Sequence, residues 1–230
     1  MTAPDVTDRA ATLLEVLVRC DALTFGDFIT RSGRPTPYFV NLGNVGTGRE
    51  LAQLGGLYAD AIHEAFGDGV DVLFGPAYKG IALAVATGVA FAERHDRNLG
   101  VCFDRKEAKD HGEGGTLIGH HLADGDRVVI VEDVTTAGTS VRATVPMLRA
   151  AADVEVVGLV VGVDRREHGS RREVSALDEL GEELGLSTVA LATLDDIIGH
   201  LGDREVDGRR VITDADLARL RTHRAEHGVT

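Results

Sequence analysis

Short apolar runs alternate with amphipathic stretches along most of the chain. Apolar runs of five to ten residues predict buried strands at 70–74, 99–103, 127–131, 154–163 and 188–192. Apolar positions spaced three and four residues apart predict helices between them, at 8–20, 49–66, 81–95, 139–152 (interrupted by Pro146), after 173, after 192 and in the charged tail from Asp214. Strands that alternate with helices predict an α/β architecture around a mostly parallel central sheet.

Functional residues are expected where the strands end, because ligands bind beyond the carboxyl ends of the strands in open α/β sheets. Four of the predicted strands end at Phe74, Phe103, Val131 and Val163. The segment 104–116 is nearly all charged or glycine, which is typical of a solvated hairpin tip or of a mobile loop with glycine hinges.

The segment from Val128, VVIVEDVTTAGTSV, joins a buried strand, two acids and a hydroxyl-rich turn to a helix. Small residues let the backbone approach a ligand, and N–H groups at a helix start suit a phosphate dianion. Glu132 and Asp133 would repel that phosphate inside the same cradle, so we expect them to accept hydrogen bonds from the hydroxyls of a neighbouring sugar. The predicted ligand is therefore a ribose 5′-phosphate. The turn consists of Thr135, Thr136, Ala137, Gly138, Thr139 and Ser140.

An ordinary helix start after a strand, capped by Thr139 or Ser140, is the alternative interpretation of this segment. The spacing GxxxxGK[ST] of a P-loop is absent, and so is the GxGxxG pattern of a dinucleotide fold.

Composition and charge narrow the classes of partner. The 230 residues suit one large domain, and no repeat or linker divides them. The net charge of −13 argues against nucleic acid or an anionic membrane as partner, because either needs a basic face. No apolar run is long enough to span a membrane, and the N-terminus does not resemble a secretory signal. The two cysteines, Cys20 and Cys102, lie in different contexts and indicate a reducing, cytoplasmic setting.

Lysine is rare in this chain. Of the 24 basic residues only Lys79, Lys106 and Lys109 are lysines, and all three follow predicted strands. Lysine is a compact charge on a flexible stem whereas arginine is a planar fork, so a lysine in an arginine-biased chain can mark a role that arginine cannot fill. Chance retention on a solvated surface is the alternative.

Five segments resemble a known family. VVIVEDVTTAGTS is similar to the phosphoribosyl-pyrophosphate motif of the type I phosphoribosyltransferases. Within that group, the orotate phosphoribosyltransferases are resembled by FGPAYKGI (74–81), FDRKEAKDHGEGG (103–115), SGRPTPYFVN (32–41) and DRREHG (164–169). The resemblance covers roughly residues 20–200. It implies transfer of a phosphoribosyl group from 5-phospho-α-D-ribosyl 1-pyrophosphate (PRPP) to orotate, which yields orotidine 5′-monophosphate and pyrophosphate in pyrimidine biosynthesis.

The resemblance also implies how the chain is organised. One phosphoribosyltransferase domain spans 1–230, with a small hood over the base from about 20–45 and 185–200. A catalytic lid lies at 103–116, and a helical tail of no assigned role lies at about 205–230. The loop that contains Tyr78 is expected to carry a cis peptide bond after Ala77.

Site residues are carried over by the same resemblance. PRPP would be bound by Arg31 (where the family usually has lysine), Tyr78, Lys79, Val134 and the residues from Glu132 to Ser140. Orotate would contact Phe39, Val40, Thr136 and Arg165, whose guanidinium suits a carboxylate clamp. In the lid, Lys109 would neutralise charge on the leaving group, assisted by Arg105, Lys106 and His111. Mg²⁺ would be held mainly by PRPP, and the lid would complete the active site of a partner in a homodimer.

Other interpretations stay open at several of these positions. A purine phosphoribosyltransferase would share the phosphate motif, and a regulator that binds PRPP without chemistry would share it too. Arg165 could instead belong to an ion-pair cluster with Asp164 and Glu167 at the surface. A zinc site at His111, Glu113, His120 and His121 is disfavoured because no cysteine or HExxH pattern accompanies them. Cys102 lies between Val101 and Phe103, where a buried thiol would be inert.

Overall fold

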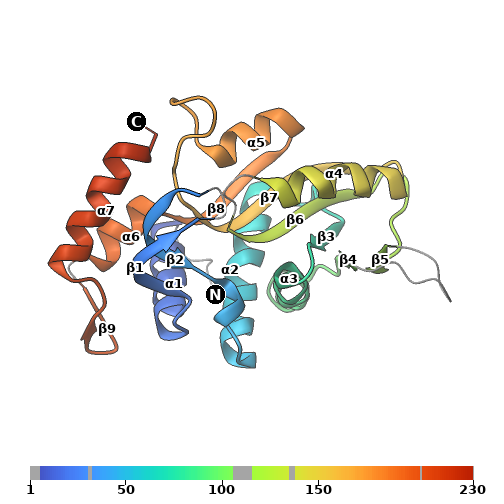
Figure 1. Ribbon diagram of the computed structural model, residues 1–230. Coiled ribbons are helices and arrows are strands. Elements are labelled where there is room, and N and C mark those ends of the chain that lie inside the picture. Colours follow the sequence, from blue (N-terminus) through green and yellow to red (C-terminus); the bar gives the residue numbers. More distant parts are fainter. Residues whose placement is uncertain (1–5, 31–32, 106–115, 135–137, 203, 230) are drawn as a thin grey trace.

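A six-stranded sheet forms the centre of the protein in the computed structural model (Figure 1), which describes residues 6–30, 33–105, 116–134, 138–202 and 204–229. The strands lie in the order β5-β4-β3-β6-β7-β8. Their bounds are β3 (Val72–Gly75), β4 (Gly100–Asp104), β5 (Leu117–Gly119), β6 (Arg127–Val134), β7 (Glu155–Asp164) and β8 (Ser187–Thr193). Only β5 runs antiparallel to its neighbour, so the predicted mostly parallel sheet is confirmed.

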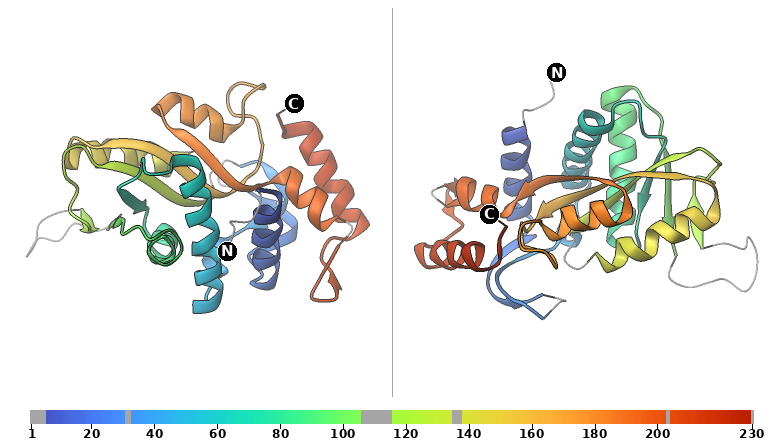
Figure 2. Two further views of the ribbon diagram at one scale, coloured as in Figure 1. Left: turned by 180° about the vertical axis from the view of Figure 1, so that it is seen from behind. Right: turned by 90° about the horizontal axis from the view of Figure 1, so that it is seen from above.

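Helices cover both faces of this sheet (Figure 2). On one face lie α2 (Gly48–Phe66) and α3 (Lys79–His95), with α1 (Val6–Arg19) beside them, and on the other lie α4 (Thr139–Ala151) and α5 (Ala176–Leu184). The side chains of β6 alternate between two apolar cores: Val129 and Val131 pack into one, Val128 and Ile130 into the other. A strand buried on both faces therefore appears as a continuous apolar run in the sequence.

The predicted interruption of a helix at Pro146 is wrong. Helix α4 continues past Pro146 to Ala151. Proline removes one backbone hydrogen bond and crowds the preceding turn. Burial of Val141, Val145 and Leu148 against the sheet offsets that loss and holds the helix together.

A second, two-stranded antiparallel sheet stands apart from the first. It consists of β1 (Leu23–Ile29) and β2 (Pro35–Val40), which we call the hood sheet. The expected hood segment 185–200 is divided differently: β8 is the edge strand of the central sheet, because it pairs in parallel with β7, and α6 (Leu194–Leu201) packs against α1 and α7.

The tail of the chain folds back onto the hood sheet. After a short hairpin of β9 (Glu205–Val206) and β10 (Arg209–Arg210), helix α7 (Asp214–His227) packs against β2 (Figure 1). Leu217, Leu220 and His223 are buried on one side of this helix. The tail, to which the sequence assigned no role, thus packs against the hood sheet and supports it.

Candidate active site

The loops that were expected to bind ligand meet at one edge of the central sheet. Strands β4, β3, β6 and β7 are consecutive neighbours, and all four run in parallel. From β3 the chain continues outward to β4, whereas from β6 it continues outward in the opposite direction to β7. The boundary between β3 and β6 is therefore the topological switch point of the sheet, where ligands bind in this class of fold.

The loop after β3 turns sharply into helix α3. A side chain at Gly75 would lie 2.0 Å from the carbonyl oxygen of Gly80, so only glycine fits there. The Ala77 N–H donates to Asp104 Oδ1 at 2.6 Å, and the Ala77–Tyr78 peptide bond is cis, as expected. The Tyr78 side chain is 69% exposed. Asp104 was not predicted as an anchor of this loop, although its place at the end of β4 put a carboxylate at the right edge.

One ion pair bridges the switch point. Lys79 Nζ, at the start of α3, lies 2.8 Å from Asp133 Oδ2 near the end of β6. The Lys79 side chain is half-exposed and Asp133 is buried. The other carboxylate oxygen of Asp133 accepts a hydrogen bond from the Val134 N–H at 2.7 Å. This arrangement places an accessible ammonium and a fixed carboxylate side by side at the switch point.

Strand β6 extends three residues past its predicted end, so Glu132 and Asp133 lie within the strand. Burial raises the pKa of Glu132, and the negative charge of Asp133 raises it further. The wholly buried Tyr58 donates its hydroxyl proton to the Glu132 carbonyl oxygen at 2.8 Å, which fixes this part of the strand from below. Two adjacent carboxyl groups with different burial are therefore held in place near the end of β6.

Helix α4 begins with glycine as its cap residue. Gly138 has a φ of 64° and has no side chain with which to cap the first turn. A Cβ at this position would lie 2.8 Å from the Leu180 methyl groups, so glycine is required for conformation and for space. Thr139 and Ser140 are exposed and lie within the helix, so the prediction that one of them is the cap residue is wrong. The uncapped N–H groups suit an anion.

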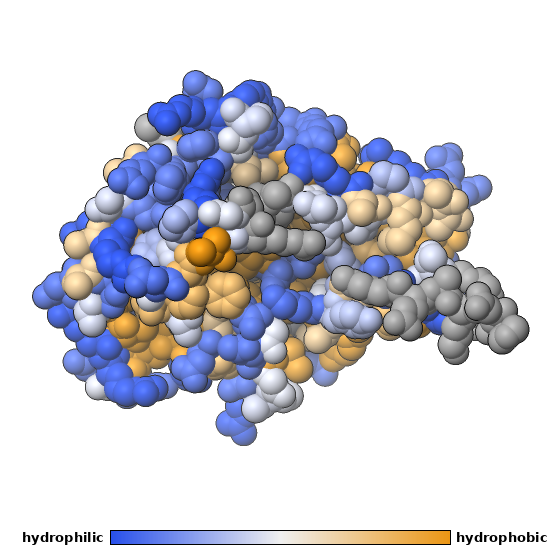
Figure 3. Space-filling view, viewed as in Figure 1, coloured by the Kyte–Doolittle hydropathy of each residue, from blue (hydrophilic) through white to orange (hydrophobic). Residues whose placement is uncertain are grey.

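The hood sheet presents an aromatic surface next to this edge. Phe39 is 46% exposed and stacks on Phe28 with ring centroids 5.5 Å apart. Apolar side chains reach the surface over β1 and β2 (Figure 3). The Val40 side chain, in contrast, is buried in the main core, so only its backbone is available to a ligand.

Arg165, directly after β7, is almost wholly buried. Its Nε donates to Glu167 Oε1 at 2.8 Å, and its Nη2 donates to Thr36 Oγ1 at 2.7 Å. The guanidinium carbon lies 4.5 Å from the centroid of the Tyr38 ring. Arg165 does pair with Glu167, as the alternative interpretation predicted. The pair is buried beneath the hood sheet, however, and is not a cluster at the surface.

Several predicted site residues lie outside the described residues: Arg31, Lys106, Lys109, His111, Thr135, Thr136 and Ala137. Arg105 is described, and its N–H donates to the Thr116 carbonyl oxygen at 2.9 Å at the base of the β4–β5 hairpin. His120 and His121 are exposed, as expected. Cys102 is buried, as expected, and burial raises the pKa of its thiol to about 12, which disfavours the reactive thiolate.

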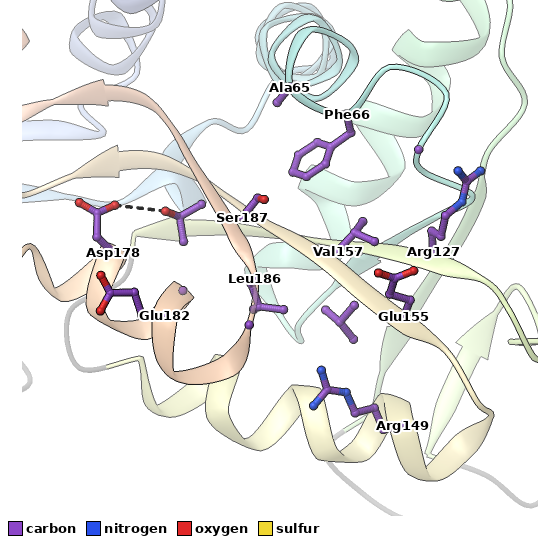
Figure 4. Close-up of a pocket in the computed structure, with 15 residues that line it drawn as sticks. Ala65, Phe66, Arg127, Arg149, Glu155, Val157, Asp178, Glu182, Leu186 and Ser187 are labelled. Atoms are coloured by element: carbon purple, nitrogen blue, oxygen red, sulfur yellow. Dashed lines mark hydrogen bonds between the residues drawn. The ribbon is translucent and has the colours of Figure 1, made fainter.

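A cavity of about 990 Å³ lies at the opposite edge of the sheet (Figure 4). Its lining includes Glu155 and Ser187, the first residues of β7 and β8, together with Arg127 at the start of β6. At one side of the cavity, the Thr188 hydroxyl donates to Asp178 Oδ1 at 3.2 Å. The cavity shares no residue with the predicted site. Within the described part of the chain, no helix has the length and apolar character that a membrane span needs.

Comparisons with known proteins agree with this geometry. The sequence model of the phosphoribosyl transferase domain matches residues 42–179. Orotate phosphoribosyltransferase of Clostridium beijerinckii is 49% identical over 215 residues, which cover 94% of this chain and 96% of that protein. The crystal structure of orotate phosphoribosyltransferase from Francisella tularensis has a TM-score of 0.76 at 28% identity and covers 94% of this chain and 98% of its own. The Mycobacterium tuberculosis enzyme in complex with inorganic phosphate has a TM-score of 0.61 at 25% identity over 82% of this chain and 98% of its own.

Proposed function

The chain belongs to the orotate phosphoribosyltransferase family, and we propose from this membership and from the site above that it transfers the phosphoribosyl group of PRPP to N1 of orotate. The products are orotidine 5′-monophosphate and pyrophosphate. The observation that carries the assignment of the site is the Lys79–Asp133 pair across the switch point, at the same end of β6 as the start of α4.

The donor is proposed to bind along the ends of β3 and β6. Glu132 and Asp133 accept hydrogen bonds from the ribose hydroxyls, and the 5′-phosphate lies against residues 134–140 at the start of α4. Tyr78 and Lys79 contact the pyrophosphate, with Arg31 as a further cation. When the donor binds, the Lys79 ammonium exchanges its partner Asp133 for the more highly charged pyrophosphate. Asp133 is then released to the sugar.

Orotate is proposed to lie between the hood sheet and the end of β7. The exposed ring of Phe39 and the backbone of Val40 form its apolar surroundings, and Thr136 and Arg165 supply polar contacts. Arg165 is held in advance by Glu167 and Thr36, so its guanidinium reaches the orotate carboxylate without first being ordered.

The reaction asks for positioning and charge stabilisation. As the bond between C1 and pyrophosphate breaks, C1 gains oxocarbenium character and negative charge grows on the leaving group. Lys109, with Arg105, Lys106 and His111, neutralises that charge when the lid closes. Mg²⁺ prefers hard oxygen ligands and would supply further charge neutralisation when bound, with the donor providing most of its ligands.

Assembly and location are also proposals. A homodimer in which each lid completes the partner's site is supported by Val85 and Val89, exposed apolar residues one turn apart on α3. A cytoplasmic location is supported by the two cysteines, which are both unpaired as in a reducing compartment.

The test is orotate consumption, followed by its ultraviolet absorbance. We expect loss of absorbance only when both PRPP and Mg²⁺ are present. Adenine and hypoxanthine, offered in place of orotate, distinguish a purine enzyme. Binding of PRPP in a calorimeter without turnover of any base would point to a regulator and would contradict the proposed reaction.

A further inference from the structure

Helix α7 places a histidine next to Glu167, the residue that holds the proposed orotate contact Arg165. His223 Nε2, on α7, lies 2.9 Å from Glu167 Oε1, the same oxygen that accepts from Arg165. The side chains of Arg165, Glu167 and His223 are each at most 10% exposed. His223 is thus the outer member of a buried chain of contacts that leads from the tail of the protein to the guanidinium proposed to bind orotate.

Glu167 is the centre of this chain. Its Oε1 accepts from Arg165 and from His223, and its Oε2 accepts from Arg34 Nη1 at 2.7 Å. These donors come from segments that are far apart in the sequence, namely the start of β2, the end of β7 and α7. A carboxylate with donors on both oxygens cannot rotate without losing a charge-assisted hydrogen bond.

The protonation of Glu167 agrees with such a role. Burial by itself would raise the pKa of this carboxyl group. The hydrogen bond from His223 and the positive charge of Arg165 outweigh burial and lower the pKa to about 2. Glu167 is therefore an anion throughout the neutral range, and it holds the Arg165 guanidinium by charge as well as by geometry.

The backbone ties the same parts together. The Val229 N–H donates to the Arg166 carbonyl oxygen and the His168 N–H to the His227 carbonyl oxygen, both at 2.9 Å. Arg166 itself has a φ of 52°, which turns the chain so that Arg165 and Glu167 meet although they are only two residues apart. Residues 227–229 are thus hydrogen-bonded to the turn that carries Arg165 and Glu167.

We propose that His223 is a positioning residue for the base: by donating to Glu167 it fixes the carboxylate that orients Arg165 toward orotate. This inference rests on the proposed function, because it takes Arg165 as the orotate contact. His223 does not touch the substrate. Besides Glu167, its ring contacts the ring of Tyr38 on β2 edge-on and the ring of His227 on its own helix.

The experiment compares His223→Leu with His223→Gln. Leucine removes the donor, whereas the glutamine amide nitrogen can reach the place of Nε2 and donate to Glu167. We expect His223→Leu to raise the KM for orotate about tenfold or more, the effect of losing a hydrogen bond to a charged group, with the KM for PRPP within about twofold. His223→Gln should restore the KM for orotate to within about threefold of the wild type. An unchanged KM for orotate in the leucine variant, or equal rises for both substrates, overturns the proposal.

Matched variants separate a positioning role from mere packing. If His223→Leu does not fold, His223→Asn takes its place, because its shorter amide keeps polarity but does not reach Glu167. A KM for orotate higher in the asparagine than in the glutamine variant supports the proposal, and equal values overturn it.

The proposed function can fail separately. If the wild-type protein does not consume orotate, the function is wrong whatever the variants do. If the wild type is active but Arg165→Lys leaves the KM for orotate unchanged, Arg165 is not the base contact and the role of His223 is overturned while the reaction stands.

Discussion

The donor side and the base side of the proposed site are built in opposite ways. On the donor side, each binding segment is a short run of consecutive residues, 75–79 and 132–140. Tyr78 is exposed there and Lys79 is half-exposed. On the base side, Arg165 is buried and already bonded to partners from β2 and from the turn after β7, and through Glu167 to α7. The first side depends on local backbone geometry, the second on long-range packing.

This difference predicts different kinds of sensitivity. A group that is held in place before the ligand arrives needs little reorganisation, which favours tight and selective recognition of a planar carboxylate. The position of Arg165 is also sensitive to distant substitutions, because its partner Glu167 is bonded to His223 on α7, far away in the sequence. On the donor side, only substitutions of residues that contact PRPP should therefore change its binding. On the base side, substitutions far from orotate should change the binding of orotate.

The largest effect is expected in the lid. Lys109→Ala should lower turnover by on the order of 10²–10³-fold, comparable with removal of one donor to a developing oxyanion. The KM for orotate should change little, because this lysine belongs to the leaving-group side. Steady-state kinetics with saturating PRPP and Mg²⁺ measure both quantities, and Lys109→Arg tests whether charge alone suffices. An unchanged rate would show that the lysine has no catalytic part.

The second effect concerns the stability of the base side in acid. The pKa of Glu167 in the folded protein, about 2, lies below its ordinary value of 4.5, so folding is favoured by the anion. That contribution is complete above about pH 5 and is lost as the pH falls toward 2, with about 2 kcal/mol lost between pH 6 and pH 3. Urea denaturation at these two pH values should therefore show a steeper acid loss for the wild type than for Glu167→Gln.

The exposed Glu205 offers the matched control for this titration. Glu205→Gln should keep the acid slope of the wild type, because its side chain lies at the surface in the β9–β10 hairpin. Equal slopes in the wild type and Glu167→Gln would mean that Glu167 is not held as an anion by its neighbours, and the base side would then resemble the donor side.

The same contrast explains what could be predicted from the sequence. The order of strands and helices followed from apolar periodicity, and the donor motif followed from consecutive residues between Val128 and Ser140. These are local patterns, so each can be recognised within a short window. The predicted end of β6, at Val131, was nevertheless three residues too early. The acids Glu132 and Asp133 belong to the strand, and their polarity hid its continuation.

The base side could not be predicted in the same way. Thr36, Arg34 and His223 meet Arg165 or Glu167 only through tertiary folding. The segment 32–41 was recognised by its resemblance to the family, but nothing in it indicated that Arg34 and Thr36 would bond to Glu167 and Arg165. The one available signal was the spacing of Leu217, Leu220 and His223, three residues apart on one face of a charged helix. With so few apolar positions, that face was too weak a pattern to show that the tail packs on the hood.

A smaller effect is expected at the ion pair across the switch point. Lys79→Met keeps most of the stem but removes the charge, and should raise the KM for PRPP about tenfold, the loss of one charge-assisted contact. The KM for orotate should stay within about twofold of the wild type. Lys79→Arg, which keeps the charge in a different shape, should fall between the two. Equal rises for both substrates would contradict the separation of the two sides.

The smallest effect is expected at the opposite edge of the sheet. Arg127 donates to both carboxylate oxygens of Asp71 at 2.8 and 2.9 Å, and this bonding lowers the pKa of Asp71 to about 2. Both side chains are more than a third exposed, so solvent screens their attraction and most of its apparent strength is lost. Arg127→Gln should therefore lower Tm by no more than about 3 °C, measured by circular dichroism. It should leave both KM values unchanged, because β6 separates this edge from the crevice by its full length. A shifted KM for orotate alone would show that the base side depends on packing even further away than α7.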